Sequence, residues 1–245
     1  MTHRSTAITL LPACALATAA MAGPPYITDD PDPTDTGHYE IYLFASGTRA
    51  QGGRDGAVGL DPSYGAAPDL QLSSTLPVAY ENPDGGPLIG GLSNVEFAAK
   101  YRILHQKSSG IDLSIFPRVI LPSASNRVGD QHASLFLPVW LGRHMGKWST
   151  FGGGGCTLND AEGAKDSCLV GWAVTYRVLE NLEVGGEIYH QTPDDSAGRH
   201  STGLGFGARY DQSATLHFVG SIGPGIQNAD ETNQLSAYAA ALFTF

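Results

Sequence analysis

Long apolar runs are almost absent from this chain of 245 residues. Beyond Ala22, no stretch approaches the ~18 consecutive apolar residues that a helix needs to cross a bilayer, so spanning helices are excluded. If the mature chain enters a membrane, it does so as strands. The apolar stretch from Ala7 to Ala20 is interrupted by polar residues and by Pro12, and it is too short to span.

Residues 1–22 have the pattern of a cleaved signal peptide. His3 and Arg4 precede the apolar stretch, and Ala20 and Ala22 frame a small-x-small cleavage site. We expect export and a mature chain that starts at Gly23. The length of this mature chain suits one domain of barrel or sandwich size.

Basic residues and cysteines are scarce as well. The 14 Lys and Arg stand against 24 Asp and Glu, which argues against nucleic acid as a partner because phosphate binding needs a basic surface. After loss of Cys14, the pair Cys156 and Cys168 predicts a disulfide across a hairpin loop of an exported protein. Two thiols without a nearby His or third Cys cannot complete a zinc site, so we expect neither a metal nor a cofactor.

Alternation of apolar and polar residues predicts strands along most of the mature chain. Short connections alternate with longer ones, which is typical of the periplasmic turns and outer loops of a membrane barrel, and this rhythm requires a strand before Asp69. The twelve expected strands are Gly37–Arg49, Arg54–Tyr64, Asp69–Tyr80, Leu92–Ile103, Ile111–Leu121, His132–Arg143, Lys147–Cys156, Cys168–Val178, Leu182–Thr192, Arg199–Tyr210, Thr215–Pro224 and Gln234–Phe245.

Prolines count against this interpretation. Pro62, Pro77, Pro117 and Pro138 each remove a backbone donor inside an expected strand, so bulges or shorter strands should occur there. Alternation alone also fits a soluble sandwich. Residues 23–36 are rich in proline and aspartate and lack periodicity; they are expected to be a flexible N-terminal segment that either is solvated or plugs the lumen. The aspartates lack the terminal Glu of a calcium loop.

Several stretches carry a resemblance to known proteins. The final strand, Leu235 to Phe245, ends on an aromatic residue and resembles the C-terminal signal that the barrel-assembly machinery reads in bacterial outer-membrane proteins. Together with TDDPDPTDTGHYE, YGAAPDLQL, LPVWLGRHMGKWSTFGGGG and GEIYHQTPDD, it resembles the outer-membrane transporter-like β-barrels of the MetA-pathway phenol-degradation family. The resemblance covers nearly the whole mature chain. It implies a barrel surrounded by outer-membrane lipid and linked to the uptake of small hydrophobic or aromatic molecules.

The predicted strand phase defines two sets of residues. Tyrosines placed before periplasmic turns should form the aromatic girdle at the membrane interface, together with the terminal Phe. These residues are Tyr64, Tyr101, Tyr176, Tyr210 and Phe245. The alternative is that the tyrosines are ordinary strand formers. Polar residues of the opposite face should line the lumen, pair with one another and influence selectivity: Glu96, Lys100, Arg102, Arg118, Arg177, Glu183, Glu187, Tyr189, Gln191, Arg209, His217 and Tyr238.

Glycines would remove side chains from the barrel wall at two places. The run Gly152 to Gly155 and the alternating Gly203, Gly205 and Gly207 leave room for a ligand or for the N-terminal segment, or let the sheet bend.

The sequence therefore predicts an all-β, antiparallel, up-and-down transmembrane barrel of about twelve strands at residues 37–245. The expected function is passive, porin-like uptake of a small-molecule solute through the bacterial outer membrane. One alternative is a lipid-modifying enzyme, for which only His132 and Ser134 share a strand face; no acid is placed beside them, so no catalytic residue is assigned. The other is a structural surface barrel, which the small loops disfavour.

Overall fold

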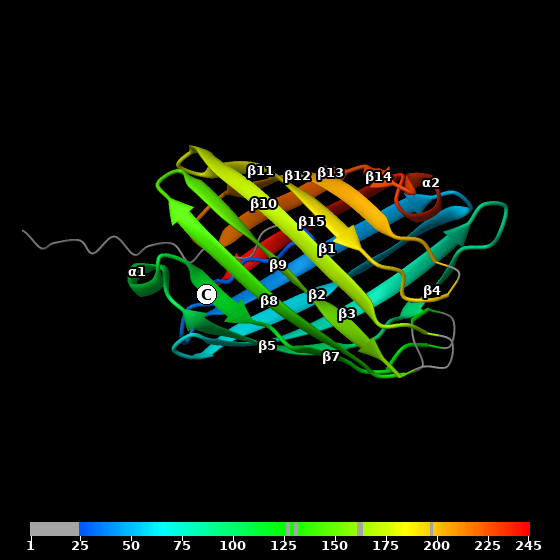
Figure 1. Cartoon of the computed structure of the whole chain (residues 1–245), viewed down its shortest axis with the longest axis horizontal. Coiled ribbons are helices and arrows are strands. Elements are labelled where there is room, and N and C mark those ends of the chain that lie inside the picture. Colours follow the sequence, from blue (N-terminus) through cyan, green and yellow to red (C-terminus); the bar gives the residue numbers. More distant parts are fainter. Residues whose placement is uncertain (1–24, 126–127, 130–131, 161–163, 197) are drawn as a thin grey trace, which may run out of the picture.

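A single antiparallel sheet closes on itself in the computed structural model, which describes residues 25–125, 128–129, 132–160, 164–196 and 198–245. Figure 1 shows the barrel from the side. β1 (Tyr39–Ala50) pairs with β15 (Leu235–Thr244) along its whole length, from Glu40 opposite Thr244 to Arg49 opposite Leu235, and this pairing closes the barrel. The expected signal peptide lies outside the described residues.

Twelve barrel strands are built from fifteen segments of the described chain. The continuous strands are β1, β2 (Gly53–Ala67), β3 (Leu70–Pro83), β8 (Ser134–Met145), β9 (Trp148–Asn159), β10 (Ser167–Leu179), β11 (Leu182–Gln191), β12 (Ser201–Asp211) and β15. The interrupted strands are β4 (Ile89–Leu92) with β5 (Glu96–Leu104), β6 (Asp112–Ile115) with β7 (Arg118–Ile120), and β13 (Leu216–Gly223) with β14 (Gly225–Gln227). Two single-turn helices, α1 (Gln106–Ser109) and α2 (Ala229–Thr232), lie in connections. The predicted fold class and strand count are confirmed.

Prolines disturb the sheet less than expected. Pro117 does separate β6 from β7. The expectation of bulges or shorter strands is wrong for Pro62, Pro77 and Pro138, which lie inside continuous strands. The ladder between β2 and β3 simply skips Pro62, while the carbonyls of Pro77 and Pro138 still accept backbone hydrogen bonds. A strand residue directs its N–H toward one neighbour only, so each proline removes a donor from a single ladder.

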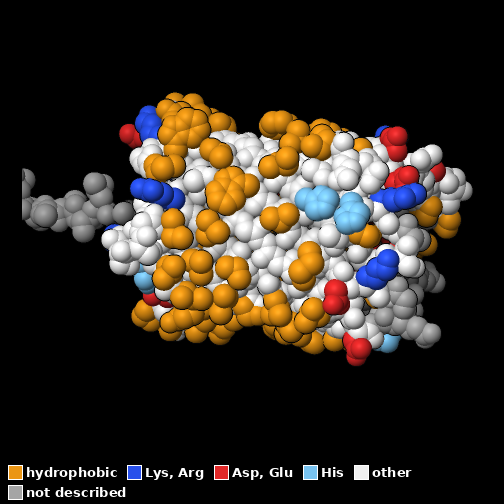
Figure 2. All heavy atoms as spheres, viewed as in Figure 1, with side chains coloured by type: hydrophobic (Ala, Val, Ile, Leu, Met, Phe, Trp, Pro, Cys, Tyr) orange, Lys and Arg blue, Asp and Glu red, His pale blue; other side chains and the backbone are white. Residues whose placement is uncertain are grey.

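The outer surface of the barrel is apolar. Figure 2 shows hydrophobic side chains over much of the visible face, with charged side chains gathered toward the two ends. Leu43, Trp172 and Phe206 are among the exposed residues of this surface, and Phe206 is 60% exposed. Such a belt is stable where lipid tails surround it. No helix within the described residues is long and apolar enough to cross a membrane.

The two ends of the barrel differ in the way that the predicted topology requires. The chain ends at the same end of the barrel as α1, whereas α2 and β4 lie at the other end (Figure 1). Connections near α1 include the two-residue turns 146–147 and 180–181, and most connections near α2 are longer; the exception at the α2 end is the two-residue turn 51–52 between β1 and β2. By the predicted phase, the α1 end faces the periplasm.

Candidate functional site

The N-terminal segment, residues 25–36, lies inside the barrel. It hydrogen-bonds to inward side chains of four strands: Pro25 O accepts from Ser221 of β13, Thr28 N donates to Glu187 of β11, Pro31 O accepts from Ser114 of β6, and Thr34 N donates to Gln71 of β3. β3 and β11 stand on opposite sides of the strand order, so the segment crosses the lumen.

Ion pairs join the segment to the charged wall of the lumen. Lys100 Nζ lies 3.1 Å from Asp29 Oδ1 and 3.5 Å from Asp30 Oδ1, and the side chain of Lys100 is almost completely buried. Arg118 Nη2 contacts the other Asp29 oxygen at 3.0 Å. Burial raises the pKa of the Asp30 carboxyl to about 7, although Lys100 opposes that shift. Two wall cations therefore share one aspartate of the segment.

A second cluster holds the segment near the α1 end. Asp32 accepts from Arg102 Nη1 at 2.9 Å and contacts His144 Nε2 at 3.0 Å. Asp32, Asp112 and His144 bring possible metal-ligand atoms within 4.8 Å of one another. The guanidinium of Arg102 also lies 3.9 Å from Asp112 Oδ1, so a positive charge already occupies the neighbourhood. This cluster is better suited to holding the segment than to binding a cation.

Glycines of the wall make room for the segment. A Cβ atom added to these glycines would lie closer than 3 Å to it: Gly142 (2.9 Å from Pro31), Gly171 (2.1 Å from Thr28), Gly185 (2.7 Å from Tyr26) and Gly207 (2.8 Å from Tyr26). Side chains essentially never approach so closely. The inner surface is therefore shaped to the segment at these four positions.

The two glycine groups singled out in the sequence have different surroundings. A Cβ on Gly203 would lie 2.3 Å from the Tyr189 hydroxyl, and one on Gly205 would lie 2.7 Å from a Glu187 oxygen. With Gly207, these positions make room for inward groups. In the other run, a Cβ on Gly154 would lie 2.0 Å from a carbonyl oxygen of β10, so close strand approach requires glycine there.

Within the described residues, three cavities border the segment, and Ile27 lines each of them. The outer cavity, about 440 Å³, lies among the strand ends that lead into the long loops, and it is bordered by Phe136, Tyr189 and Asn233. The central cavity, about 340 Å³, is bordered by the charged residues Asp29, Asp32, Glu40, Asp61, Glu96, Lys100 and Arg118. The side cavity, about 170 Å³, lies between the segment and β12, β13 and β15. The lumen thus has an entrance of mixed polarity and a charged centre.

The predicted lumen residues alternate with exposed apolar residues along their strands. Lys100, Glu187, Tyr189, Arg209 and His217 are buried. Glu96, Arg118 and Tyr238 border the central cavity, and Gln191 borders the outer cavity. Arg102 binds Asp32, while Arg177 and Glu183 lie opposite each other in the ladder between β10 and β11.

Two phenylalanines of the lumen, Phe116 and Phe136, were missed by the sequence reasoning. Arg118 Cζ lies 4.3 Å from the ring centroid of Phe116 and 5.8 Å from that of Phe136, and Lys100 Nζ lies 4.8 Å from the Phe116 ring. A signal was available, because Phe116 has the same strand parity as Arg118, and Phe136 has the same parity as Ser134. The aromatic and cationic side chains connect the outer cavity with the central one.

The expected girdle residues lie on the outer surface. Tyr64, Tyr101, Tyr210 and Phe245 are exposed. Tyr176 packs against Trp148, with 4.6 Å between the ring centroids. All belong to strand ends near the short turns or to the chain terminus. Their role as an interface girdle stays a prediction.

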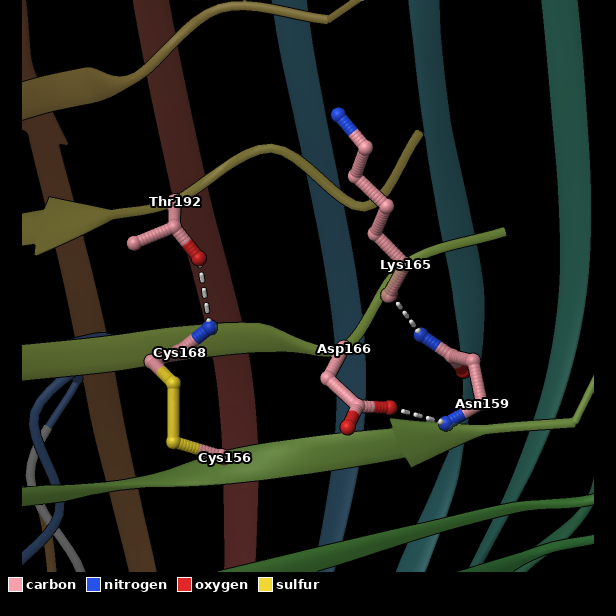
Figure 3. Close-up of a disulfide and its surroundings, with 6 residues drawn as sticks. All are labelled: Cys156, Asn159, Lys165, Asp166, Cys168 and Thr192. Atoms are coloured by element: carbon pink, nitrogen blue, oxygen red, sulfur yellow. Dashed lines mark hydrogen bonds between the residues drawn. A yellow bond between two sulfur atoms is a disulfide. The ribbon is translucent and has the colours of Figure 1, made fainter. Parts of the chain in front are cut away.

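The predicted disulfide is present. Cys156 and Cys168 lie directly opposite each other on β9 and β10 and are bonded (Figure 3). Next to it, Cys168 N donates to Thr192 Oγ1 at 2.7 Å, which ties this hairpin to the residue that follows β11. Asn159 N donates to Asp166 Oδ1 at 3.0 Å across the same loop. The disulfide therefore closes the base of a long loop at the entrance.

A closed twelve-stranded barrel with an apolar belt and a charged lumen is a transmembrane β-barrel of the outer-membrane type. The chain belongs to the family described as "Putative MetA-pathway of phenol degradation", whose model matches residues 62–243. None of the curated proteins matches the chain.

Solved structures share this fold at low sequence identity. The COG4313 outer membrane channel from Pseudomonas putida F1 is 12% identical with a TM-score of 0.72, and the match covers 88% of this chain and 98% of that one. The KdgM porin is 12% identical with a TM-score of 0.59, covering 84% and 99%. The toluene transporter TbuX from Ralstonia pickettii is 9% identical with a TM-score of 0.50, covering 86% and 90%. These similar structures are channels, porins and transporters, and their fold agrees with the predicted outer-membrane location.

Proposed function

We propose that this protein is a passive outer-membrane channel for small, hydrophobic or aromatic molecules. The observation that carries the proposal is the row of cavities inside a closed barrel, which starts with an entrance lined by both apolar and polar groups. The description of the family refers to phenol degradation, and a protein of the same fold is described as a toluene transporter. Outer-membrane lipid surrounds the belt, and the barrel-assembly machinery recognises the closing strand.

The N-terminal segment acts as the plug of this channel. It crosses the lumen between the outer and central cavities, and ion pairs to Lys100, Arg102 and Arg118 fix its position. A solute must pass beside the segment or displace it. The lumen-facing charges then influence which solutes pass, because every solute must cross the charged central cavity beside the segment.

Uptake into cells tests the channel directly. Pure bilayers are too permeable to small aromatics, so radiolabelled phenol and toluene should be supplied at low concentration to a host whose outer membrane excludes them. Expression of the protein should speed entry of at least one of the two solutes, and purified protein in a planar bilayer should conduct ions. The proposal is wrong if entry matches that of the empty-vector host and no conductance is observed.

We infer that the protein has no enzymatic activity. In the described part of the chain, no hydrogen bond joins His132 to Ser134 or to a carboxylate. A serine hydrolase needs such a relay. Purified protein should not hydrolyse phospholipid, and Ser134→Ala should leave solute uptake unchanged. Lipid hydrolysis that disappears in this variant would establish the enzyme instead.

A further inference from the structure

Two cations on the wall of the central cavity converge on one carboxylate of the segment. Lys100 Nζ lies 3.1 Å from Asp29 Oδ1, and Arg118 Nη2 lies 3.0 Å from Asp29 Oδ2. Each oxygen of Asp29 therefore meets its own cation. Charge-assisted hydrogen bonds to both oxygens are an arrangement that binds a carboxylate strongly. We call Lys100 and Arg118 the cationic pair.

The barrel wall positions the cationic pair independently of the segment. Lys100 belongs to β5 and Arg118 to β7, and these two strands pair with each other, with Ala98 opposite Arg118. Both charged groups also lie against the ring of Phe116, at 4.8 Å and 4.3 Å from its centroid. Phe116 is buried, so its ring is a fixed support. The pair therefore remains in place when the segment withdraws.

Lys100 depends on the segment for its hydrogen bonds and ion pairs. Within the described residues, its ammonium group donates to Asp29 Oδ1 and to the backbone carbonyls of Asp30 and Asp32, and it forms ion pairs with Asp29 and Asp30. All of these groups belong to the segment. Withdrawal of the segment alone leaves a buried ammonium group without an anion, which is strongly unfavourable. A free anion in the place of Asp29 removes this penalty.

The contact with Asp29 is accessible from the lumen. Asp29 and Arg118 both border the central cavity of about 340 Å³, and their side chains are 19% and 25% exposed. Ile27 of the segment separates this cavity from the outer one, which is lined by Ile120 and Phe136 among others. The ring centroid of Phe136 lies 5.8 Å from Arg118 Cζ. A carboxylate at the cationic pair therefore has an apolar surface nearby for the rest of the molecule.

The charges around the cationic pair favour a solute with a single carboxylate. Glu96 of β5 lies 3.5 Å from Arg118 Nη1 and stays on the wall when the segment withdraws. Glu40 and Asp61 also border the central cavity, although neither forms an ion pair with the cationic pair in the described part of the chain. Exchange of Asp29 for one free carboxylate leaves the charge at this position unchanged. A second negative charge would meet Glu40, Asp61 and Glu96 without a cation of its own.

We propose that the cationic pair is a binding site for small organic monocarboxylates with an apolar body, and that Asp29 of the plug occupies this site when no such solute is present. On binding, the oxygens of the solute contact Lys100 and Arg118, and the segment withdraws together with Asp29. No covalent step is involved. The proposal goes beyond uptake of uncharged aromatic molecules, because it assigns an anion site that exists whether or not those molecules pass.

Two variants that both loosen the plug test the site. 19F NMR titration of the purified mature protein in detergent gives a Kd for 4-fluorobenzoate and for 4-fluorobenzamide, its uncharged counterpart of similar shape, after subtraction of a micelle-only reference. Asp29→Asn removes the competing carboxylate and keeps the cationic pair. Loss of this partly exposed ion pair should raise the released fraction about 30-fold, and the affinity for 4-fluorobenzoate should rise by the same factor. Arg118→Gln removes part of the site itself, so it should bind this anion at least roughly tenfold more weakly than Asp29→Asn. Asp35→Asn, at an exposed position of the segment, is the matched control, and 4-fluorobenzamide should bind equally to all variants.

Either of two results overturns the site: Asp29→Asn binds 4-fluorobenzoate no more tightly than Asp35→Asn does, or Arg118→Gln binds it as tightly as Asp29→Asn. If Arg118→Gln loses the heat-modifiable migration of a folded barrel, Lys100→Gln takes its place, because it removes the other cation of the pair. Single-channel recording at constant ionic strength tests displacement of the plug. Benzoate should raise the frequency of large openings and benzamide should not; equal frequencies would refute displacement.

Binding in detergent is measured without transport, so it separates this site from the proposed channel. Failure of 4-fluorobenzoate to bind refutes the anion site and leaves uptake of phenol and toluene unaffected. Binding with the expected dependence on Asp29 and Arg118, in a protein that does not speed entry of phenol or toluene, supports the site and refutes only the channel for uncharged solutes.

Discussion

Neutralising Asp29 should release the N-terminal segment from the lumen. Asp29→Asn removes the contacts of that carboxylate with Lys100 at 3.1 Å and with Arg118 at 3.0 Å. Breaking a fully buried ion pair costs about 3–5 kcal/mol. Because the side chains of Asp29 and Arg118 are 19% and 25% exposed, we expect about 2 kcal/mol here. That energy corresponds to roughly a 30-fold change in the ratio of released to inserted segment.

Single-channel recording in planar bilayers measures this ratio through the frequency of large openings. Asp29→Asn should raise that frequency about 30-fold. Asp35→Asn makes the same change at an exposed position of the same segment and should behave like the unsubstituted protein. In a double-mutant cycle with Lys100→Gln, the two substitutions should be far from additive because they break the same contact. Identical openings in Asp29→Asn, Asp35→Asn and the unsubstituted protein would refute the assignment of Asp29 as an anchor of the plug.

Three further predictions concern the wall, the belt and the disulfide. Gly207→Ala should displace Tyr26 and raise the frequency of large openings without loss of heat-modifiable migration. Gly186→Ala should leave the openings unchanged, because the nearest atom to the added Cβ would be 3.2 Å away. Equal recordings for the two variants would contradict the fit between the barrel wall and the segment. Val174→Arg, in the middle of β10, should lower the free energy of unfolding from vesicles by about 2–4 kcal/mol in a denaturant titration, whereas Leu88→Arg in a loop should have little effect. Reduction of the disulfide between β9 and β10 should lower the same free energy by about 2–3 kcal/mol, and a double Cys→Ser variant should no longer respond to the reductant.

The fold was predictable because one periodicity dominates the chain. Lipid on one side and a wet lumen on the other impose alternation on every strand, so parity places Glu96, Lys100 and Arg102 on one face and Phe97 and Tyr101 on the other. The lengths of the connections then determine the strand count. Pro62, Pro77 and Pro138 misled the prediction, because a sequence does not reveal which of the two ladders loses a donor at each proline.

The position of the N-terminal segment could not be derived from the sequence. Residues 25–36 have no periodicity, and their aspartates are compatible with solvent as well as with a charged lumen. Only the folded wall shows that Lys100 and Arg118 meet at Asp29. The glycines were ambiguous for the same reason, since the lack of a side chain at Gly207 has meaning only when Tyr26 is seen to occupy the space.

The ion pairs of the N-terminal segment fix its position in the lumen but can be broken. Its aspartates meet Lys100, Arg102 and Arg118, and its apolar contacts include Tyr26 beside Phe151, with 6.3 Å between the ring centroids. Ion pairs contribute little net stability once the cost of desolvation is counted, but they disfavour every other arrangement of the same charges. Water that fills a lumen during release can solvate both partners again. A segment held in this way has one well-defined inserted position, and hydration can replace its ion pairs if it withdraws, which is what the proposed channel would require of its plug.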